Sequence, residues 1–407
     1  MTYIQFDIYL SRNESQLNMK PNPGGQLNPD NIVGRDALIA DMWAILDGRS
    51  IYMNDLRRVG KTMILRKMEA HPPKGWVAVK RDLGGCHTAA EFASRAYRDS
   101  AEVLSRKKRA MRRMEQLLGA AKGAEIAGVL KLPGGSPAPW KEVLTRTFTD
   151  LDEEMERAAS HFVFLWDEVP FLLASVAKDE RPTVAMEILD ALRSLGQDYP
   201  RVRLVLTGSV GLHHVLTSLR GQGYLNSPLN HMERVAPGPL APADAAELAL
   251  DLLKGAGLEC ADPKALARTV AEAVGNVAFY IHKLVSRLPP RQAVTPALIE
   301  ATLQKELAHP DNDWDLAHYR TRLPLYYGQN KPLVLLILDA VAASEAPIPF
   351  EALRRQLSSQ TRLAEPQRLR DLLTLLQQDH YLDRDPNGGY RFRFALIRRW
   401  WHFDRNL

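Results

Sequence analysis

The segment that most constrains this chain is an eight-residue loop, residues 55–62. It fits the phosphate-binding pattern G-x-x-x-x-G-K-[ST] at every position except the first. An apolar run at 51–53 precedes the loop and predicts a strand, and residues 62–70 predict a helix that ends before two prolines. A phosphate-binding loop needs a strand before it and a helix after it. The segment therefore predicts an α/β fold in which a strand, this loop and a helix follow one another.

Each residue type in the loop has a physical reason to be there. Gly60 allows backbone N–H groups to come close to a phosphate, and the N-terminus of the following helix favours negative charge. We expect Lys61 to reach the β- and γ-phosphates of a nucleotide, and the Thr62 hydroxyl to bind Mg²⁺. The residues predicted to contact a nucleotide from this loop are Arg57, Arg58, Val59, Gly60, Lys61 and Thr62.

The departure from the pattern is Asp55, which stands where the first glycine is expected. Aspartate tolerates a left-handed turn better than most residues, so the loop can still close. Its charge would repel the phosphates if the side chain turned toward them. We expect the side chain to face away, because an aspartate can hydrogen-bond its own backbone two residues on and so stabilise the turn locally.

A second apolar run, 162–166, ends in two adjacent carboxylates, Asp167 and Glu168. A buried strand that ends in two charges is costly unless both emerge at a functional edge. In a phosphate-loop ATPase the first carboxylate holds Mg²⁺ through water, and the second acts as a general base on the attacking water. Together with Lys61 and Thr62, the two carboxylates indicate an enzyme that hydrolyses a nucleotide rather than a kinase.

A third apolar run, 202–206, ends in a Thr-Gly-Ser turn that begins at Thr207. A hydroxyl at the tip of the neighbouring strand can orient the catalytic water and sense the γ-phosphate. Thr207 is therefore a candidate catalytic residue, together with Lys61 and Glu168. A turn that contacts no ligand is the alternative that the sequence leaves open.

The rest of the chain changes character from one part to the next. Strands separated by helical patterns, including a strand at 76–79, predict a mostly parallel sheet covered by helices. From about Ala241 to Leu288 the patterns are helical only, which predicts a small helical domain. Residues 331–407 carry three helical patterns followed by a turn-linked hairpin, and this order is the outline of a winged helix.

Composition excludes several classes of protein. A length of 407 residues suggests two or three domains. The two cysteines, Cys86 and Cys260, exclude a disulfide scaffold and a cysteine-rich zinc module. No segment approaches the roughly 18 uninterrupted apolar residues of a membrane span, so we expect no membrane contact and a cytoplasmic location. The 53 Lys and Arg against 48 Asp and Glu give a net charge of +5, which is mild for this length.

Taken in order, these motifs resemble those of the prokaryotic AAA+/STAND-type ATPases, in particular the archaeal-type ATPases related to replication-initiator ATPases. The resemblance begins at 31–36, which is similar to the vGR(E/D) box before the first helix of that family. It continues through the phosphate loop, residues 165–168 and the turn at Thr207. It extends to 275–280, where the family has the start of a lid helix, and to 392–401, the end of its winged helix.

The resemblance implies a P-loop core with a five-strand parallel sheet, a helical lid and a C-terminal winged helix, with ATP and Mg²⁺ at the junction of core and lid. Val33 and Gly34 would lie beside the adenine, and Thr62 and Asp167 would be the metal ligands. Val277 departs from the family, which has a proline there. The domain limits that follow are 1–30 for an N-terminal arm, 31–235 for the ATPase core, 236–328 for the lid and 329–407 for the winged helix.

We therefore expect an ATP-binding and ATP-hydrolysing regulatory protein, a nucleotide-driven switch that acts on a partner protein or on DNA. The alternative is a DNA-binding winged-helix adaptor in which the nucleotide is structural and turnover is negligible. Further copies of the chain are a possible partner, with Arg220 or Arg234 as an arginine finger between subunits. The winged helix and a basic run at 106–113 are the candidate DNA contacts.

Two weaker signals concern the C-terminal segment and a pair of histidines. Residues 331–407 hold 12 Lys and Arg against 9 Asp and Glu, a smaller excess than DNA readers usually show. His213 and His214 are neighbours, so on a helix their side chains leave the axis about 100° apart. We expect the two histidines not to share a metal ion.

Overall fold

A computed structural model describes most of the chain, and its contacts divide the protein into two units. The core unit comprises Arg35–Gly238 and Pro366–Asp383, and the helical unit comprises Met1–Gly34, Pro239–Glu365 and Arg384–Leu407. The sequence-based domain limits stay a prediction. The residues that the structure describes are 19–101, 103–104, 139–208, 212–221, 223–290, 292–309, 313–359 and 365–407.

The core unit is built on a sheet of five strands in the order β2-β3-β4-β1-β5, and the paired strands all run parallel. All four strands predicted from apolar runs form, and the five-strand sheet implied by the resemblance is confirmed. The strands are β1 (Ile51–Asn54), β2 (Trp76–Asp82), β3 (His161–Asp167), β4 (Val202–Gly208) and β5 (Glu233–Val235).

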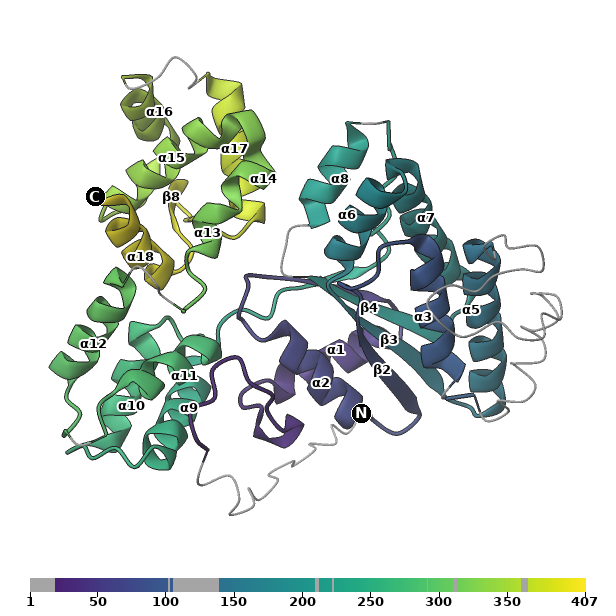
Figure 1. The fold of residues 1–407 in the computed structure, drawn as a ribbon, viewed down its shortest axis with the longest axis horizontal. Coiled ribbons are helices and arrows are strands. Elements are labelled where there is room, and N and C mark those ends of the chain that lie inside the picture. Colours follow the sequence, from purple (N-terminus) through teal and green to yellow (C-terminus); the bar gives the residue numbers. More distant parts are fainter. Residues whose placement is uncertain are drawn as a thin grey trace, which may run out of the picture. The chain divides into compact units, whose positions relative to one another are not determined.

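Helices cover both faces of this sheet (Figure 1). Helices α1 and α2 pack on one face, and α3, α5, α6 and α7 pack on the other. The described helices of the core unit are α1 (Asp36–Leu46), α2 (Lys61–Ala70), α3 (Ala89–Ala101), α5 (Trp140–Arg157), α6 (Val169–Asp179), α7 (Pro182–Asp198), α8 (Leu212–Arg220) and α17 (Pro366–Gln378).

Strand β3 shows why this sequence forms a central strand. A strand points successive side chains to opposite faces, and both faces of a parallel sheet are buried. Phe162, Phe164 and Trp166 point into the larger cluster with the α3, α5, α6 and α7 side chains, whereas Val163 and Leu165 join the cluster beneath α1 and α2. All five side chains are fully buried. The run is thus apolar at every position until it reaches Asp167.

The helical unit begins with helices whose start signals are visible in the sequence. Three of them begin at a proline, whose missing N–H costs nothing in the first helical turn. The side chains of Asp262 and Thr295 cap two of these N-termini by accepting hydrogen bonds from backbone N–H groups. These helices are α9 (Pro242–Gly255), α10 (Pro263–Ala273), α11 (Ala278–Arg287) and α12 (Pro296–Ala308), followed by the short α13 (His318–Thr321) and α14 (Leu323–Tyr327).

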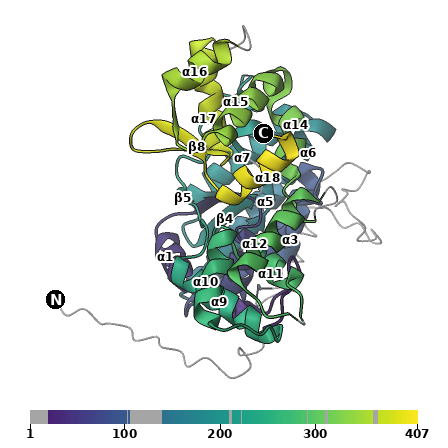
Figure 2. The ribbon, with the colours of Figure 1, turned by 90° about the vertical axis from the view of Figure 1, so that its left-hand side faces the viewer.

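The C-terminal segment has the element order of a winged helix, as predicted. Three short strands form a second sheet in the order β6-β8-β7, and β6 pairs antiparallel with β8. Helix α18 packs against α15 (Figure 2), and its Trp400 and Trp401 are buried. The elements are α15 (Lys331–Ala343), β6 (Ile348–Pro349), α16 (Phe350–Ser358), α17, β7 (Leu382–Arg384), β8 (Gly389–Phe392) and α18 (Ala395–Arg405). Within the described ranges, no helix has both the length and the apolar character that a membrane crossing requires.

Candidate nucleotide site

The candidate site lies where β1, β3 and β4 end at the same edge of the core sheet. Strand β4 is hydrogen-bonded to β3 on one side and to β1 on the other. In this register Leu206 is opposite Trp166, and Thr207 is opposite Met53. The tip of β4 therefore stands between the start of the phosphate loop and the carboxylates that end β3. Open parallel sheets bind ligands at this carboxyl edge.

The backbone of the phosphate loop has the conformation that its glycine was expected to allow. Gly60 has φ of +100°, in the region that side chains with a Cβ rarely occupy, and α2 begins directly after it at Lys61. Arg58 also has a positive φ, of +71°. A Cβ built on Gly60 would meet no atom within 4 Å, so the space above the loop is open there. The N-terminal N–H groups of α2 thus face a region that an anion can enter.

Lys61 closes the loop from within. Its ammonium donates hydrogen bonds to the carbonyl oxygens of Asp55 and Leu56, at 2.6 and 2.7 Å. Lys61 is only 6% exposed. A buried ammonium needs partners of this kind, because an unpaired charge in the interior is costly. The lysine therefore joins the end of the loop to its start and brings a positive charge into the loop.

Thr62 and Asp167, the two predicted metal ligands, are in contact at the edge of the sheet. The Thr62 hydroxyl donates a hydrogen bond to Oδ2 of Asp167 at 2.6 Å, and Asp167 is 2% exposed. Oδ1 of Asp167 accepts from the backbone N–H of Glu168 at 3.2 Å. Hydroxyl and carboxylate oxygens are the ligands that Mg²⁺ prefers, so this donor set fits that ion.

Glu168 begins the next helix in a strained backbone conformation. Its φ is +58°, which is uncommon for a residue with a side chain, and α6 starts immediately after it. Strain of this kind is often found at functional positions. Gly84, in the loop that follows β2, lies beside Glu168, since a Cβ on Gly84 would make an ordinary contact of 3.7 Å with the Cβ of Glu168.

Thr207 carries a buried hydroxyl without a partner. It is fully buried, and its Oγ1 has no hydrogen-bond partner among the residues that the structure describes. Leaving a buried polar group unsatisfied costs about 1–3 kcal/mol. The next residue, Gly208, permits a close approach, because a Cβ there would lie 2.4 Å from Cδ of Pro170 in α6. The tip of β4 is therefore packed tightly against the helix that Glu168 begins.

Asp55 directs its carboxylate at two backbone amides, one of the next residue and one far along the chain. Oδ1 accepts from the N–H of Leu56 at 2.7 Å, and Oδ2 accepts from the N–H of Gly238 at 2.6 Å. Asp55 is 1% exposed. The substitution of glycine by aspartate thus adds a link between the phosphate loop and the segment that leaves the core unit.

Arg35 is a residue of this site to which the sequence analysis assigned no role. Its guanidinium donates to the carbonyl oxygens of Val59, Pro237 and Gly238, at 3.0, 2.9 and 2.7 Å, and Arg35 is 6% exposed. The position of Arg35 in the box at 31–36 was the available signal. Its partners at 237–238 are more than 200 residues away, so no local pattern could have indicated them.

The remaining predicted residues do not belong to the phosphate loop or to the strand ends beside it. Val33 and Gly34 belong to the helical unit, where a Cβ on Gly34 would lie 2.6 Å from the Cβ of Asp244. Their place beside an adenine stays a prediction. Arg220 and Arg234 are exposed, and a role between subunits also stays a prediction. The basic run at 106–113 and Ser209 are outside the described residues.

Comparison with known proteins identifies the fold. No family model matches the sequence, and no curated protein matches it. Among solved structures, a Walker-type ATPase of Pyrococcus abyssi is similar over 95% of this chain and 99% of its own, with a TM-score of 0.64 and 16% identity. The ORC2 protein of Aeropyrum pernix is similar over 97% of both chains, with a TM-score of 0.52 and 13% identity. The chain therefore has the P-loop fold of archaeal Walker-type and ORC-type ATPases.

We expect Asp55→Gly to change ATP affinity by less than about tenfold, because the carboxylate is bound to backbone amides. The same change should lower the free energy of unfolding by about 1–3 kcal/mol, since two N–H groups lose a charged acceptor. Asp55→Asn keeps one acceptor oxygen and should lose less stability. ATP titration and denaturant unfolding measure the two effects. If Asp55→Gly bound ATP far more than tenfold tighter, the carboxylate would be acting on the phosphates.

We expect Thr207→Val to leave stability unchanged or to raise it by about 1 kcal/mol, because valine removes an unsatisfied buried hydroxyl at nearly constant volume. The matched control is Thr147→Val. Thr147 is also buried, but its hydroxyl donates to the carbonyl of Val143, so this variant should lose about 1 kcal/mol. ATP hydrolysis should fall about tenfold or more in Thr207→Val only. Equal stability losses in the two variants would show that the Thr207 hydroxyl is structural.

Proposed function

We propose that the protein is a Mg²⁺-dependent ATPase that binds its nucleotide on the phosphate loop. The observation that carries this proposal is the 2.6 Å hydrogen bond between the Thr62 hydroxyl and Asp167, beside Lys61 and at the carboxyl edge of a parallel sheet. Asp167, at the end of a buried strand, thus contacts Thr62, the residue that directly follows the lysine of the loop. The ORC2 neighbour is described in complexes with ADPNP and ADP, which agrees with a nucleotide ligand.

The binding roles follow from the chemistry of each group. The backbone N–H groups from Arg57 to Thr62 and the dipole of α2 favour phosphates, and the Lys61 ammonium neutralises their charge. Thr62 and Asp167 would hold Mg²⁺, which neutralises charge on the β- and γ-phosphates when it is bound. Val33 and Gly34 are the proposed contacts to the adenine.

The catalytic roles fall to groups at the tips of β3 and β4. Glu168 accepts a proton from the attacking water as the general base. Thr207 orients that water through its hydroxyl, which has no hydrogen-bond partner among the described residues. Lys61 stabilises the charge that develops on the phosphates. The close packing of Gly208 on Pro170 supports a fixed spacing between the two strand tips.

We further propose that nucleotide binding drives a conformational switch. The chain enters the core unit at Arg35 and leaves it at Gly238, and both residues are hydrogen-bonded to the phosphate loop. A change in the loop on binding or hydrolysis therefore acts on two of the crossings to the helical unit, those at 34–35 and 238–239. Transmission of this kind is typical of two-state closure around a ligand. The output is an action on a partner protein, on another copy of this chain or on DNA, in the cytoplasm.

A second candidate function is a DNA-binding adaptor with a structural nucleotide and negligible turnover. The element order of the C-terminal segment supports this candidate, because winged helices often bind DNA. The steady-state ATPase rate, measured with and without duplex DNA, separates the two candidates. Turnover in either condition supports the ATPase, whereas DNA binding with no turnover supports the adaptor.

We expect Lys61→Ala to weaken Mg·ATP binding by about 100-fold or more, because each charge-assisted contact to phosphate contributes about 1.5–3 kcal/mol. Isothermal titration calorimetry measures the affinity. Lys67→Ala is the matched control, since Lys67 lies on the same helix and pairs with Asp36 at 2.6 Å. Unchanged ATP affinity in Lys61→Ala would remove the assignment of the phosphate loop.

We expect Glu168→Gln to keep ATP bound but to slow turnover about 100-fold or more, because general-base assistance typically contributes 10²–10⁴. Asp167→Asn should instead weaken the dependence of the rate on Mg²⁺. Phosphate release at several Mg²⁺ concentrations measures both effects, and Glu153→Gln, on α5, is the control. Wild-type rates in both variants would mean that the acidic end of β3 is only structural.

A further inference from the structure

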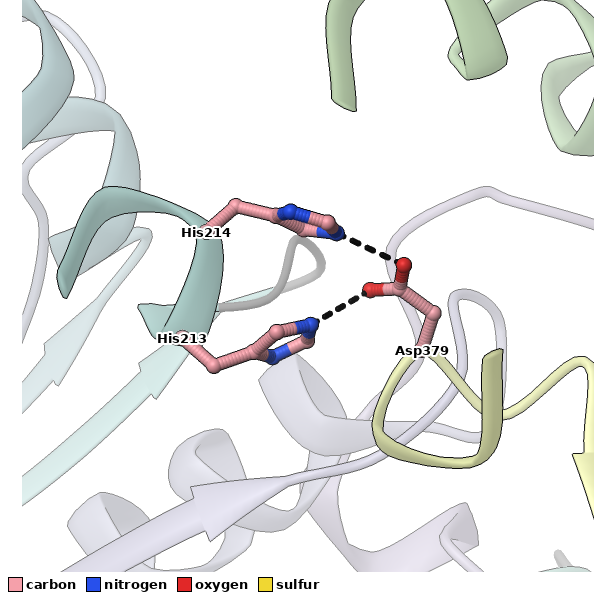
Figure 3. Close-up of side chains that lie close together, drawn as sticks. All are labelled: His213, His214 and Asp379. Atoms are coloured by element: carbon pink, nitrogen blue, oxygen red, sulfur yellow. Dashed lines mark hydrogen bonds and ion pairs between the residues drawn. The ribbon is translucent and has the colours of Figure 1, made fainter. Parts of the chain in front are cut away.

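A second cluster of titratable side chains lies in the core unit, apart from the phosphate loop. His213 and His214 are in the first turn of α8, and Asp379 directly follows α17. Nε2 of His213 lies 2.9 Å from Oδ1 of Asp379, and Nε2 of His214 lies 2.6 Å from Oδ2 (Figure 3). The two segments are about 165 residues apart in the chain. Each imidazole thus approaches a different oxygen of one carboxylate.

The sequence predicts that His213 and His214 do not share a metal ion, but in the structure both contact the same carboxylate. Their side chains do leave the helix in different directions, but the ring centroids are only 4.3 Å apart, with 39° between the ring planes. Both rings turn their Nε2 atoms toward Asp379 (Figure 3). Rotation about the side-chain bonds compensates for the angle between the Cα–Cβ bonds, because the ligating atom of an imidazole is far from the backbone.

The cluster is largely buried, with its carboxylate the most deeply buried group. The side chains of His213, His214 and Asp379 are 19%, 12% and 1% exposed. Burial by itself would raise the pKa of Asp379, but its interactions with the two imidazoles hold that pKa far below the ordinary value. A buried carboxylate is costly without such compensation. Two imidazole nitrogens and a carboxylate are therefore held together with little exposure to solvent.

The hydrogen bonding in this cluster is incomplete. His214 makes a hydrogen bond with the carboxylate. The Nε2 atom of His213 is buried and close to Oδ1, but it has no hydrogen-bond partner among the described residues, so this contact lacks the geometry of a hydrogen bond. The ligand atoms of the three residues all lie within 4.8 Å of one another.

We propose that His213, His214 and Asp379 bind a divalent transition-metal ion of the Zn²⁺ type. Zn²⁺ takes imidazole nitrogens at about 2.0–2.1 Å and carboxylate oxygens at about 2.0–2.2 Å, with water completing a four-coordinate site. Mg²⁺ and Ca²⁺ prefer all-oxygen ligands, so this site differs in chemistry from that of Thr62 and Asp167. Within the described parts of the chain, this is the only group of three such ligands.

The ion would join two distant segments of the core unit. Helix α8 follows β4, the strand that ends beside the nucleotide site, and Asp379 follows the third helix of the winged-helix pattern. A metal bound to both segments stabilises the state in which they are in contact, because the separated ligands bind it far less tightly. This inference does not depend on nucleotide binding and is tested without it.

The test is a titration of Co²⁺ and Zn²⁺ into the full chain without an affinity tag, in the presence of excess Mg²⁺ and without nucleotide. We expect one Co²⁺ per chain, a visible absorption band, and displacement by Zn²⁺. Asp379→Asn keeps the shape of the side chain and should weaken Co²⁺ binding about 100-fold or more, since it removes an anionic ligand. His213→Gln, at the more exposed imidazole, should do the same and keeps the test valid if Asp379→Asn unfolds.

The matched control is His87→Gln. His87 also lies beside a carboxylate, with Nδ1 3.4 Å from Asp179, but this exposed pair offers only two ligand groups. The control variant should bind Co²⁺ like the wild type, and Zn²⁺ should raise the melting temperature of both by a few degrees. Absence of stoichiometric binding to the wild type, or equal binding by Asp379→Asn and His213→Gln, would show that the cluster is an ion pair only and would overturn the proposal.

Discussion

The architecture of the site depends on two buried charged residues that tie the phosphate loop to the ends of the core segment. Arg35 donates to three carbonyl oxygens, one in the loop and two at 237–238, and Asp55 accepts from the N–H of Gly238. Both residues are almost fully buried, so each must keep its partners to avoid a large desolvation cost. The loop and the two ends of the segment 35–238 therefore form one connected polar network.

The sheet supplies the rigidity that this network needs. The aromatic side chains of β3 pack in sequence, with Phe162 against Phe164 and Phe164 against Trp166, and Phe92 of α3 meets Trp166 edge to face. This packing fixes the end of β3, where Asp167 reaches Thr62. The short contact between the Thr62 hydroxyl and the Asp167 carboxylate requires that the backbones of both residues have fixed positions. The packing of the apolar core thus fixes the positions of the polar side chains at the end of β3.

Much of the site could be predicted because its signals are local. The loop at 55–62 contains its own glycine, lysine and threonine, and the apolar run before Asp167 specifies a buried strand that ends in a charge. The pairing of Thr62 with Asp167 also followed, since parallel strands bring their carboxyl ends to one edge. The contact of the adjacent histidines with Asp379 could not be predicted, because another segment of the chain brings that residue to their helix.

The sequence by itself determined the order of strands and helices, the phosphate loop and the identity of the residues at the strand tips. These features depend on neighbours within a few positions, through periodicity, turn chemistry and capping. Only the tertiary structure decided that Arg35 and Asp55 meet Gly238, that the Thr207 hydroxyl is buried without a described partner, and that two histidines converge on Asp379. The physical reason is that such contacts join segments between about 165 and 200 residues apart, and their geometry is set by packing of whole elements rather than by any local pattern.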